Sequence, residues 1–254
     1  MSNQTGPELS DDQHSFFRKE GYLSIPRITD DGELDWLRET YARLVEDERA
    51  FKVKYTEPGS DGIITQIFSP ELREPKLVQT AYVRNALRLA AGLLGVPQEK
   101  VTYGGMLLIY KPPAAGRDVP WHQDEAYWEL PTKHCHSLSV WLPLDDVTVE
   151  SGCMQFLPKS HHADFLTYRQ PDGAQPLVLD EPVDLSAAVA CPIPAGGATF
   201  HHCRTLHYTG PNVSPNPRRV FTTIFHGPQT DRAVPRPRPW LKNPFEVTGT
   251  PLPR

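Results

Sequence analysis

The chain lacks both a dense run of one charge and a long apolar segment, and each absence excludes a class of partner. Lysine and arginine number 26 against 31 aspartates and glutamates, which gives a formal net charge of -5. Nucleic acids and acidic membrane surfaces are bound through concentrated basic patches, and a membrane-spanning helix needs about 20 predominantly apolar residues. We therefore expect neither nucleic acid nor a membrane as a partner, and a small molecule instead.

Cysteine is also scarce, with four residues at Cys135, Cys153, Cys191 and Cys203. None of them forms a Cys-x-x-Cys pair, and their scatter fits neither a zinc knuckle nor a disulfide framework. Residues 1–12 are polar and contain no apolar core of a secretory signal. These features predict reduced thiols and a cytoplasmic protein.

The patterns along the 254 residues predict a single domain over 1–254. Amphipathic segments come first, in a helical part over about 10–95, and short apolar or alternating runs follow in a barrel part over about 100–226. Prolines crowd a tail over 227–254, which we expect to lie extended on the surface or to be mobile. The expected fold is mainly β with flanking helices, as an antiparallel barrel or jelly roll.

Helix start and stop signals bound the first part of the chain. Ser10 and Gln13 have the spacing of a capping box, and Gly21 is a C-terminal stop, so a short helix is expected between them. Apolar residues at helical spacing predict a second helix that opens at Thr29 and a third over Pro75–Leu94.

The strands are predicted from short runs between proline, glycine and aspartate clusters. They are Tyr22–Ile25, Met106–Tyr110, Ser137–Leu142, Met154–Leu157, Ala198–His207 and Val220–Phe225. The stretch Arg49–Glu74 has no clear period, and we expect it to be a long loop that acts as an active-site flap.

Two candidate metal ligands, His122 and Asp124, are separated by one residue. Residues two apart on a strand project to the same side, so both side chains can bind one ion. A third ligand must come from a distant strand placed opposite, and His207 is the candidate. Two imidazoles and one carboxylate suit non-heme Fe(II) oxygenases because they leave coordination positions open. A lone His-x-Asp triplet is more often a solvated or hydrogen-bonded pair beside a turn. Whether these residues bind a metal therefore depends on the motifs elsewhere in the sequence.

Histidine is common here, and His201, His202 and His207 share one predicted strand. Strand alternation alone does not choose between His201 and His207 as the ligand.

Four segments, in this order, resemble the phytanoyl-CoA dioxygenase family of Fe(II)- and 2-oxoglutarate-dependent oxygenases. They are Lys111-Pro112-Pro113 with Val119-Pro120-Trp121-His122-Gln123-Asp124, then Val140-Trp141-Leu142-Pro143-Leu144-Asp145-Asp146, then Glu150-Ser151-Gly152 with Leu157-Pro158-Lys159-Ser160-His161, and finally the run from His207-Tyr208-Thr209-Gly210-Pro211-Asn212 to Arg218-Arg219. Lys159 stands where the family's Pro-Gly-Ser-His turn has glycine. The resemblance extends from about Leu9 to about Phe225.

The resemblance implies a cupin-like double-stranded β-helix with Fe(II) held by His122, Asp124 and His207. It also implies 2-oxoglutarate on the metal, with its far carboxylate bound by Arg218 and assisted by the hydroxyl of Thr209. A guanidinium suits this role because its planar fork matches a carboxylate with two hydrogen bonds. Arg219 is the rival of Arg218, but adjacent strand residues face opposite ways, and the family spacing favours Arg218.

Four further residues are candidates near the site. Trp141 falls near the family position that packs beside the co-substrate, although without the resemblance it is simply a core tryptophan. Tyr127 and Trp128 either line the substrate pocket or cover the mouth of the barrel. The resemblance selects His207 as the ligand and leaves His202, like His201, as a pocket residue or a purely structural one.

The implied reaction is hydroxylation of an unactivated carbon of a small metabolite, with O2 consumed and 2-oxoglutarate converted to succinate and CO2. Related halogenases lack the carboxylate that Asp124 supplies, so hydroxylation is favoured, with desaturation or ring formation as variants. Two alternatives stay open: a cupin-type metalloenzyme that does not use 2-oxoglutarate, and a catalytically silent barrel that only binds.

Overall fold

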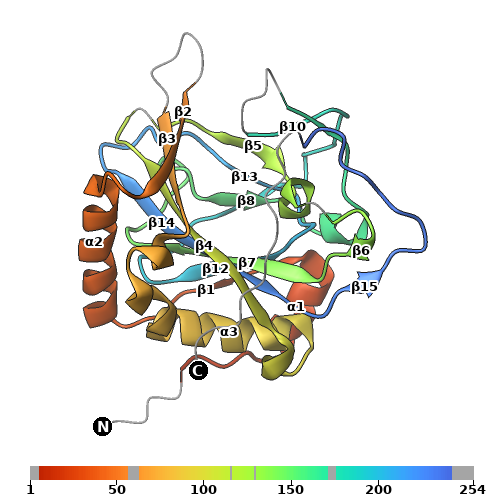
Figure 1. Cartoon of the computed structure of the whole chain (residues 1–254), viewed down its shortest axis with the longest axis horizontal. Coiled ribbons are helices and arrows are strands. Elements are labelled where there is room, and N and C mark those ends of the chain that lie inside the picture. Colours follow the sequence, from red (N-terminus) through yellow and green to blue (C-terminus); the bar gives the residue numbers. More distant parts are fainter. Residues whose placement is uncertain (1–5, 57–62, 115, 129, 171–175, 242–254) are drawn as a thin grey trace.

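Two antiparallel sheets stack face to face in the computed structural model, which describes residues 6–56, 63–114, 116–128, 130–170 and 176–241 (Figure 1). The seven-stranded sheet has the order β1 (Tyr22–Ile25), β12 (Ala198–His202), β7 (Ser137–Pro143), β14 (Arg218–His226), β4 (Thr102–Lys111), β3 (Ile63–Phe68), β2 (Phe51–Thr56). The four-stranded sheet has the order β11 (Val189–Cys191), β8 (Met154–Phe156), β13 (His207–Thr209), β5 (Val119–His122). Two short ribbons pair β9 (Tyr168–Arg169) with β10 (Val178–Leu179) and β6 (Lys133–His134) with β15 (Thr230–Asp231). Among the described strands no ladder joins the two larger sheets, so the predicted jelly roll is confirmed as an open one.

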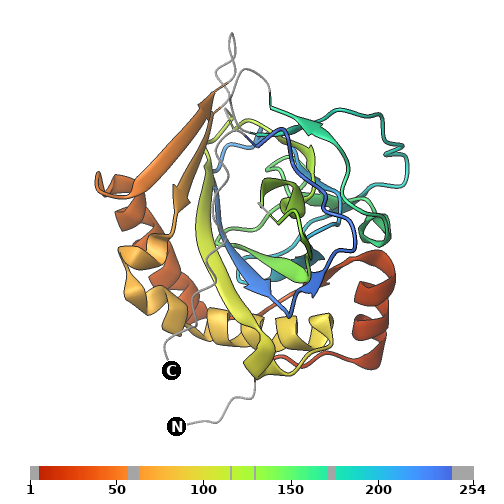
Figure 2. The ribbon, with the colours of Figure 1, turned by 45° about the vertical axis from the view of Figure 1, so that its right-hand side comes forward.

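Three α-helices pack outside the large sheet (Figure 2). They are α1 (Asp11–Glu20), α2 (Asp31–Glu46) and α3 (Ala81–Leu94), and short 3-10 turns are η1 (Pro70–Leu72), η2 (Pro75–Gln79), η3 (Gln98–Lys100), η4 (Asp124–Tyr127) and η5 (Ser160–His162). The capping box of Ser10 and Gln13 is present, and Gly21 ends α1 at φ 84°, as predicted.

Two predicted helix starts need correction. The second helix opens after Asp30, one residue later than Thr29, because the Asp30 carboxylate accepts a hydrogen bond from the Glu33 amide. The third begins only after Thr80, which caps it in the same way, and the residues just before Thr80 form the separate 3-10 turn η2.

Successive side chains of β7 face alternately the hydrophobic core under the helices and the interior of the jelly roll. Leu138, Val140 and Leu142 are buried in the cluster that contains the apolar faces of α2 and α3. Ser137, Ser139 and Trp141 project to the other face. The helices therefore hold the outer face of the large sheet, and its inner face is free to carry a site.

The long loop expected over Arg49–Glu74 is wrong for its described residues, although several of them, such as Gln66 and Phe68, line the cavity between the sheets. Residues 51–56 and 63–68 form the β2–β3 hairpin, which extends the large sheet through the pairing of β3 with β4, and η1 follows it. Along β3, Ile64, Gln66 and Phe68 line the cavity between the sheets and Ile67 belongs to the main hydrophobic core, so its two faces meet different surroundings. Residues 57–62 lie outside the described part of the chain.

The single strand expected over Ala198–His207 is also wrong. The chain leaves β12 at His202, turns, and enters β13 at His207 in the other sheet. The turn is fixed by the Thr205 amide, which donates to the His202 carbonyl at 2.8 Å, and by the Thr205 hydroxyl, which donates to the Gly21 carbonyl. His201 and His207 therefore reach the interior from different sheets.

The described part of the proline-rich tail packs against η4. The indole nitrogen of Trp240 donates to the Ala126 carbonyl at 2.9 Å, and the Arg238 side chain is fully buried. Arg238 and Arg232 both donate to the Glu125 carboxylate, and Arg204 binds its second oxygen at 2.9 Å. Three guanidinium groups thus surround one carboxylate that has no exposed surface. Residues 242–254 lie outside the described part.

Glu125→Ala should destabilise the protein by about 3–5 kcal/mol, because it removes the buried carboxylate that three guanidinium groups share. Chemical denaturation followed by tryptophan fluorescence measures the loss. Asp35→Ala is the matched control, since it breaks the exposed Asp35–Arg38 ion pair and should change stability by less than about 1 kcal/mol. Equal losses in the two variants would contradict the role given to Glu125.

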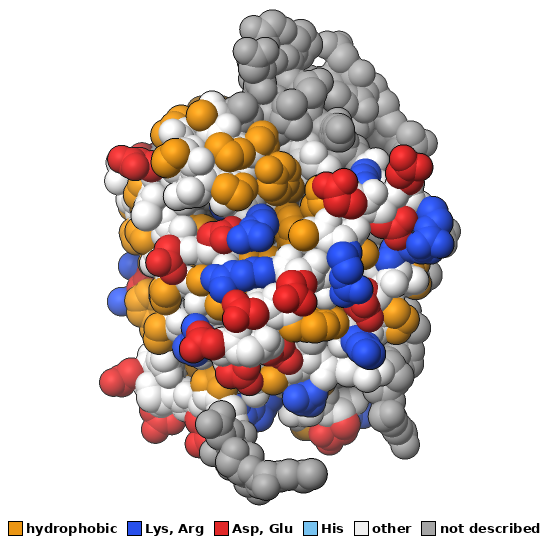
Figure 3. Space-filling model, turned by 90° about the vertical axis from the view of Figure 1, so that its left-hand side faces the viewer, with side chains coloured by type: hydrophobic (Ala, Val, Ile, Leu, Met, Phe, Trp, Pro, Cys, Tyr) orange, Lys and Arg blue, Asp and Glu red, His pale blue; other side chains and the backbone are white. Residues whose placement is uncertain are grey.

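The face that carries α2 shows acidic and basic side chains interspersed (Figure 3). No helix in the described part of the chain has both the length and the apolar character needed to cross a bilayer.

Candidate active site

His122, Asp124 and His207 converge in the space between the two sheets. Their ligand atoms all lie within 4.8 Å of one another. The Asp124 Oδ1 atom is 3.8 Å from His122 Nε2 and 3.5 Å from His207 Nε2. Strand β5 ends at His122, and the extended backbone of Gln123 turns Asp124, the first residue of η4, to the same side. The two residues therefore converge as predicted, although only His122 belongs to the strand.

The position of His207 differs from the expected one. It lies on β13, the strand next to β5, in direct register with His122, and not on a strand across the interior. The two imidazole centroids are consequently 4.1 Å apart.

Both histidines present an unprotonated Nε2 to the centre. His122 Nδ1 lies 2.7 Å from the Pro120 carbonyl and His207 Nδ1 lies 2.9 Å from the Thr205 carbonyl. A carbonyl only accepts, so each Nδ1 carries the proton and each Nε2 keeps its lone pair. Burial lowers the pKa of both imidazoles, and they are neutral near pH 7. The pair is arranged as ligands for a cation.

Asp124 is held by two side chains from the large sheet. The Ser139 hydroxyl on β7 donates to Oδ2, and His201 Nε2 on β12 lies 3.2 Å from the same oxygen. Burial would raise the pKa of the Asp124 carboxyl, but the attraction of the His207 imidazole in acid, where that ring is protonated, and the hydrogen bond from His201 outweigh burial and leave the pKa below its usual range. Asp124 is therefore a carboxylate whose Oδ1 is left to face the two histidines.

Arg218 lies at another wall of the same space and has no anionic partner among the described residues. The guanidinium is 1% exposed, donates from Nη1 to the Gly152 carbonyl at 3.0 Å, and lies 5.3 Å from the centre of the Trp141 ring. Its Nε and Nη2 atoms have no hydrogen-bond partner in that part of the chain. Burial lowers the pKa of Arg218 to about 10, so the group is still a cation at pH 7.

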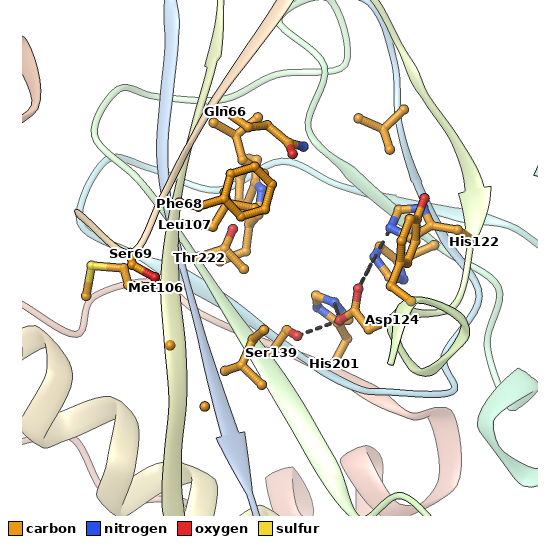
Figure 4. Close-up of a pocket in the computed structure, with 18 of the residues that line it drawn as sticks. Gln66, Phe68, Ser69, Met106, Leu107, His122, Asp124, Ser139, His201 and Thr222 are labelled. Atoms are coloured by element: carbon orange, nitrogen blue, oxygen red, sulfur yellow. Dashed lines mark hydrogen bonds and ion pairs between the residues drawn. The ribbon is translucent and has the colours of Figure 1, made fainter. Parts of the chain in front are cut away.

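A cavity of about 550 Å³ connects these groups (Figure 4). His122, Asp124, Ser139 and His201 lie on one side of it, and Gln66, Phe68, Leu107 and Thr222 lie on the other. The lining also includes Tyr127, Trp128, Trp141, His207, Thr209 and Arg218. The cavity therefore joins the three ligands to the unpaired guanidinium.

Tyr127 and Trp128 both line this cavity. The Tyr127 ring meets the His122 ring edge to face at 5.6 Å, and its hydroxyl accepts a hydrogen bond from the Leu177 amide. His202 does not line this cavity. It follows His201 on β12 and faces the opposite way, into a smaller cavity that it shares with His161.

Ser139 was not predicted as a partner of Asp124. The signal was present, because Ser139 stands two residues before Trp141 and shares its face of β7. Gln66 and Phe68 lie in the segment that was expected at the active site, but they were not predicted individually because the hairpin that carries them was taken for a loop.

A second group that could bind a cation consists of Glu125, Cys135 and Cys203. The Glu125 carboxylate is already occupied by Arg204, Arg232 and Arg238, and burial raises the pKa of the Cys203 thiol. A metal ion would face three positive charges there, so we regard this group as structural.

The chain resembles several known proteins. Phytanoyl-CoA dioxygenase domain-containing protein 1 of Danio rerio is 32% identical over 149 residues, which are 56% of this chain and 50% of that protein. The chain thus spans about half the length of this relative, and the same holds for its Bos taurus counterpart.

Solved structures match over more of the chain. EvdO2 from Micromonospora carbonacea var. aurantiaca, complexed with 2-oxoglutarate, has a TM-score of 0.80 and 33% identity over 93% of this chain and 98% of that chain. SnoN, a non-heme alpha ketoglutarate dependent epimerase from nogalamycin biosynthesis, has a TM-score of 0.70 and 25% identity over 85% of this chain and 82% of that chain.

A sequence profile of the phytanoyl-CoA dioxygenase family matches residues 17–220. This range contains the candidate ligands, Arg218 and all four motifs that suggested the family. The chain therefore belongs to the phytanoyl-CoA dioxygenase family, as its motifs predicted.

Proposed function

We propose that the protein is an Fe(II)- and 2-oxoglutarate-dependent oxygenase that hydroxylates an unactivated carbon of a small metabolite. The observation that carries the proposal is one cavity that contains both a His-Asp-His ligand set and a buried, unpaired guanidinium. A metal site alone would fit many cupin-type enzymes. The added anion site favours a co-substrate with a carboxylate.

The ligand set fits a ferrous ion. Two neutral imidazole nitrogens and one carboxylate oxygen match the 2-His-1-carboxylate arrangement, which occupies one face of an octahedron and leaves positions open. Ser139 and His201 fix the carboxylate, and two backbone carbonyls fix the imidazoles. Such outer partners hold ligands in position before the metal arrives.

The guanidinium fits the far carboxylate of 2-oxoglutarate. Burying a cation without an anion costs free energy. A carboxylate that accepts hydrogen bonds from the free Nε and Nη2 atoms of Arg218 would offset that cost. Thr209 and Trp141 line the same cavity as Arg218, and the centre of the Trp141 ring lies 5.3 Å from the guanidinium. EvdO2, with 33% identity, was crystallised with 2-oxoglutarate, which supports the assignment.

The residues of the chain bind and orient, and bound iron would supply the activation of O2. Asp124, His122 and His207 would hold the ion, and Arg218 and Thr209 would orient the co-substrate. Trp141, Tyr127 and Trp128 exclude water from the cavity walls, while the hairpin residues Gln66 and Phe68 face the ligands from the side where a substrate would lie. Because Asp124 supplies the carboxylate ligand, we favour hydroxylation over halogenation.

The test is an anaerobic titration of the Fe(II)-loaded protein with 2-oxoglutarate, followed by aerobic incubation with a metabolite pool. We expect a new visible absorption band on titration, and then succinate together with a product heavier by one oxygen atom. No band would favour the cupin-type alternative, and a band without any turnover of the pool or of 2-oxoglutarate would favour the silent barrel. A product of unchanged mass would indicate an epimerisation like that of SnoN, and loss of two hydrogens would indicate desaturation or ring closure.

A further inference from the structure

Lys111 is a buried lysine that the proposed function leaves without a role. It is the last residue of β4, is 0% exposed, and lies in register with Arg218 on β14. It does not line the cavity that contains the ligand set. A second cation directly beside Arg218 is unfavourable unless its hydrogen bonds compensate it.

All three contacts of the Lys111 ammonium go to the segment that follows His207. Its Nζ atom lies 2.9 Å from the Thr209 hydroxyl oxygen, 3.2 Å from the Thr209 carbonyl oxygen and 2.6 Å from the Gly210 carbonyl oxygen. An ammonium has three hydrogens and no lone pair, so these three acceptors use all of them. Lys111 therefore has no hydrogen left to donate to a ligand in the cavity.

The same contacts determine the direction of the Thr209 hydroxyl. Its oxygen accepts from Lys111, so its single proton has to point elsewhere, and no other hydrogen bond of this hydroxyl occurs among the described residues. Thr209 lines the same cavity as Arg218. The proton is thus available to an acceptor that lies inside the cavity.

We infer that Lys111 is a positioning residue for the co-substrate, because it orients the Thr209 hydroxyl so that this hydroxyl donates to the far carboxylate of 2-oxoglutarate. The inference rests on the proposed function. Burial and Arg218 lower the pKa of Lys111, and a carboxylate bound nearby counteracts both effects and favours the charged form.

The backbone around Lys111 supports this role. The side-chain NH2 group of Asn212 shares its two hydrogens among the carbonyls of Lys111, Pro112 and Asn216. The Lys-Pro-Pro motif and the Thr-Gly-Pro-Asn motif, which are far apart in the sequence, are therefore two halves of one unit that presents Thr209.

The experiment is a double-mutant cycle on co-substrate binding to the Fe(II)-loaded protein without oxygen, read by visible absorption and by calorimetry. The variants are Lys111→Met, Thr209→Val and the double variant, and the ligands are 2-oxoglutarate and 2-oxobutyrate, which lacks the far carboxylate. Each single variant should weaken 2-oxoglutarate binding about 10-fold or more, because a hydrogen bond to a charged group is lost. The double variant should bind within roughly 3-fold of Thr209→Val, because Lys111 acts through that hydroxyl.

Binding of 2-oxobutyrate should be the same in all four proteins. Unchanged affinity of Lys111→Met for 2-oxoglutarate would overturn the inference. So would a double variant that binds 2-oxoglutarate more weakly than Thr209→Val by the same factor as Lys111→Met loses relative to the parent protein. Equal losses of affinity for 2-oxobutyrate and 2-oxoglutarate in the variants would overturn it as well. If Lys111→Met fails to fold, Thr209→Val still tests the inference. Wild-type affinity for 2-oxoglutarate in Thr209→Val would exclude a role of Lys111 through that hydroxyl. Failure of the unmodified protein to bind 2-oxoglutarate would instead reject the proposed function.

Discussion

Asp124→Ala and His207→Ala variants will lose Fe(II) affinity and with it substrate-dependent succinate formation. Each substitution removes one of three converging donors, and the remaining two cannot enclose one face of the ion. Loss of an outer partner of a metal ligand typically lowers affinity about 10–100-fold, so loss of a ligand itself should exceed that range. Equilibrium dialysis against Fe(II) under argon and succinate assays measure the two effects.

Two further variants should show a smaller loss of Fe(II) affinity and no loss, respectively. Ser139→Ala keeps all three ligands but removes the hydroxyl that donates to Asp124, and its Fe(II) affinity should fall about 10–100-fold. His202→Gln alters the neighbour of His201 that faces away from the cavity, and its affinity should stay at the wild-type level. Wild-type succinate formation in Asp124→Ala or His207→Ala would exclude the proposed ligand set.

Arg218→Met will bind 2-oxoglutarate more than about 100-fold more weakly, because truncating a desolvated, hydrogen-bonded charge pair costs about 3 kcal/mol or more. The variant should nevertheless be as stable to heat as the parent or more so, since the free protein buries this cation with no anion beside it. Weaker binding without lower stability distinguishes a ligand anchor from a structural arginine. Anaerobic titration and thermal unfolding provide the two measurements.

The matched control is the adjacent residue. Arg219 faces the other side of β14 and binds Asp145 through two hydrogen bonds of 3.0 and 2.6 Å. Arg219→Met should lose some stability and keep its affinity for 2-oxoglutarate. A reversed pattern in the two variants would show that Arg219 is the anchor.

The positions of the candidate ligands and of Arg218 could be predicted because short-range spacing places them. One intervening residue orients His122 and Asp124 together, and alternation along β14 separates Arg218 from Arg219. The helix ends at Ser10 and Gly21 were predictable for the same local reason.

What could not be predicted depends on pairing between distant segments. Nothing near His207 in the sequence shows that β13 lies beside β5, and nothing near Glu125 shows that Arg204, Arg232 and Arg238 meet it. The hairpin that carries Gln66 and Phe68 was not predicted, because the pairing of β3 with both β2 and β4 joins segments that its local sequence does not identify. These features are set by tertiary structure.

The bonds from Arg232, Arg238 and Trp240 to η4 have a practical consequence for shortened forms of the protein. A chain cut after His226 would keep every strand of the large sheet, yet it would remove two of the three guanidinium groups around Glu125, the residue that follows Asp124. The turn that orients Asp124 would then carry a poorly neutralised buried charge. Truncation and fusion boundaries therefore belong beyond Leu241, because the last described stretch of chain supports, from outside, the turn that carries the candidate ligand Asp124.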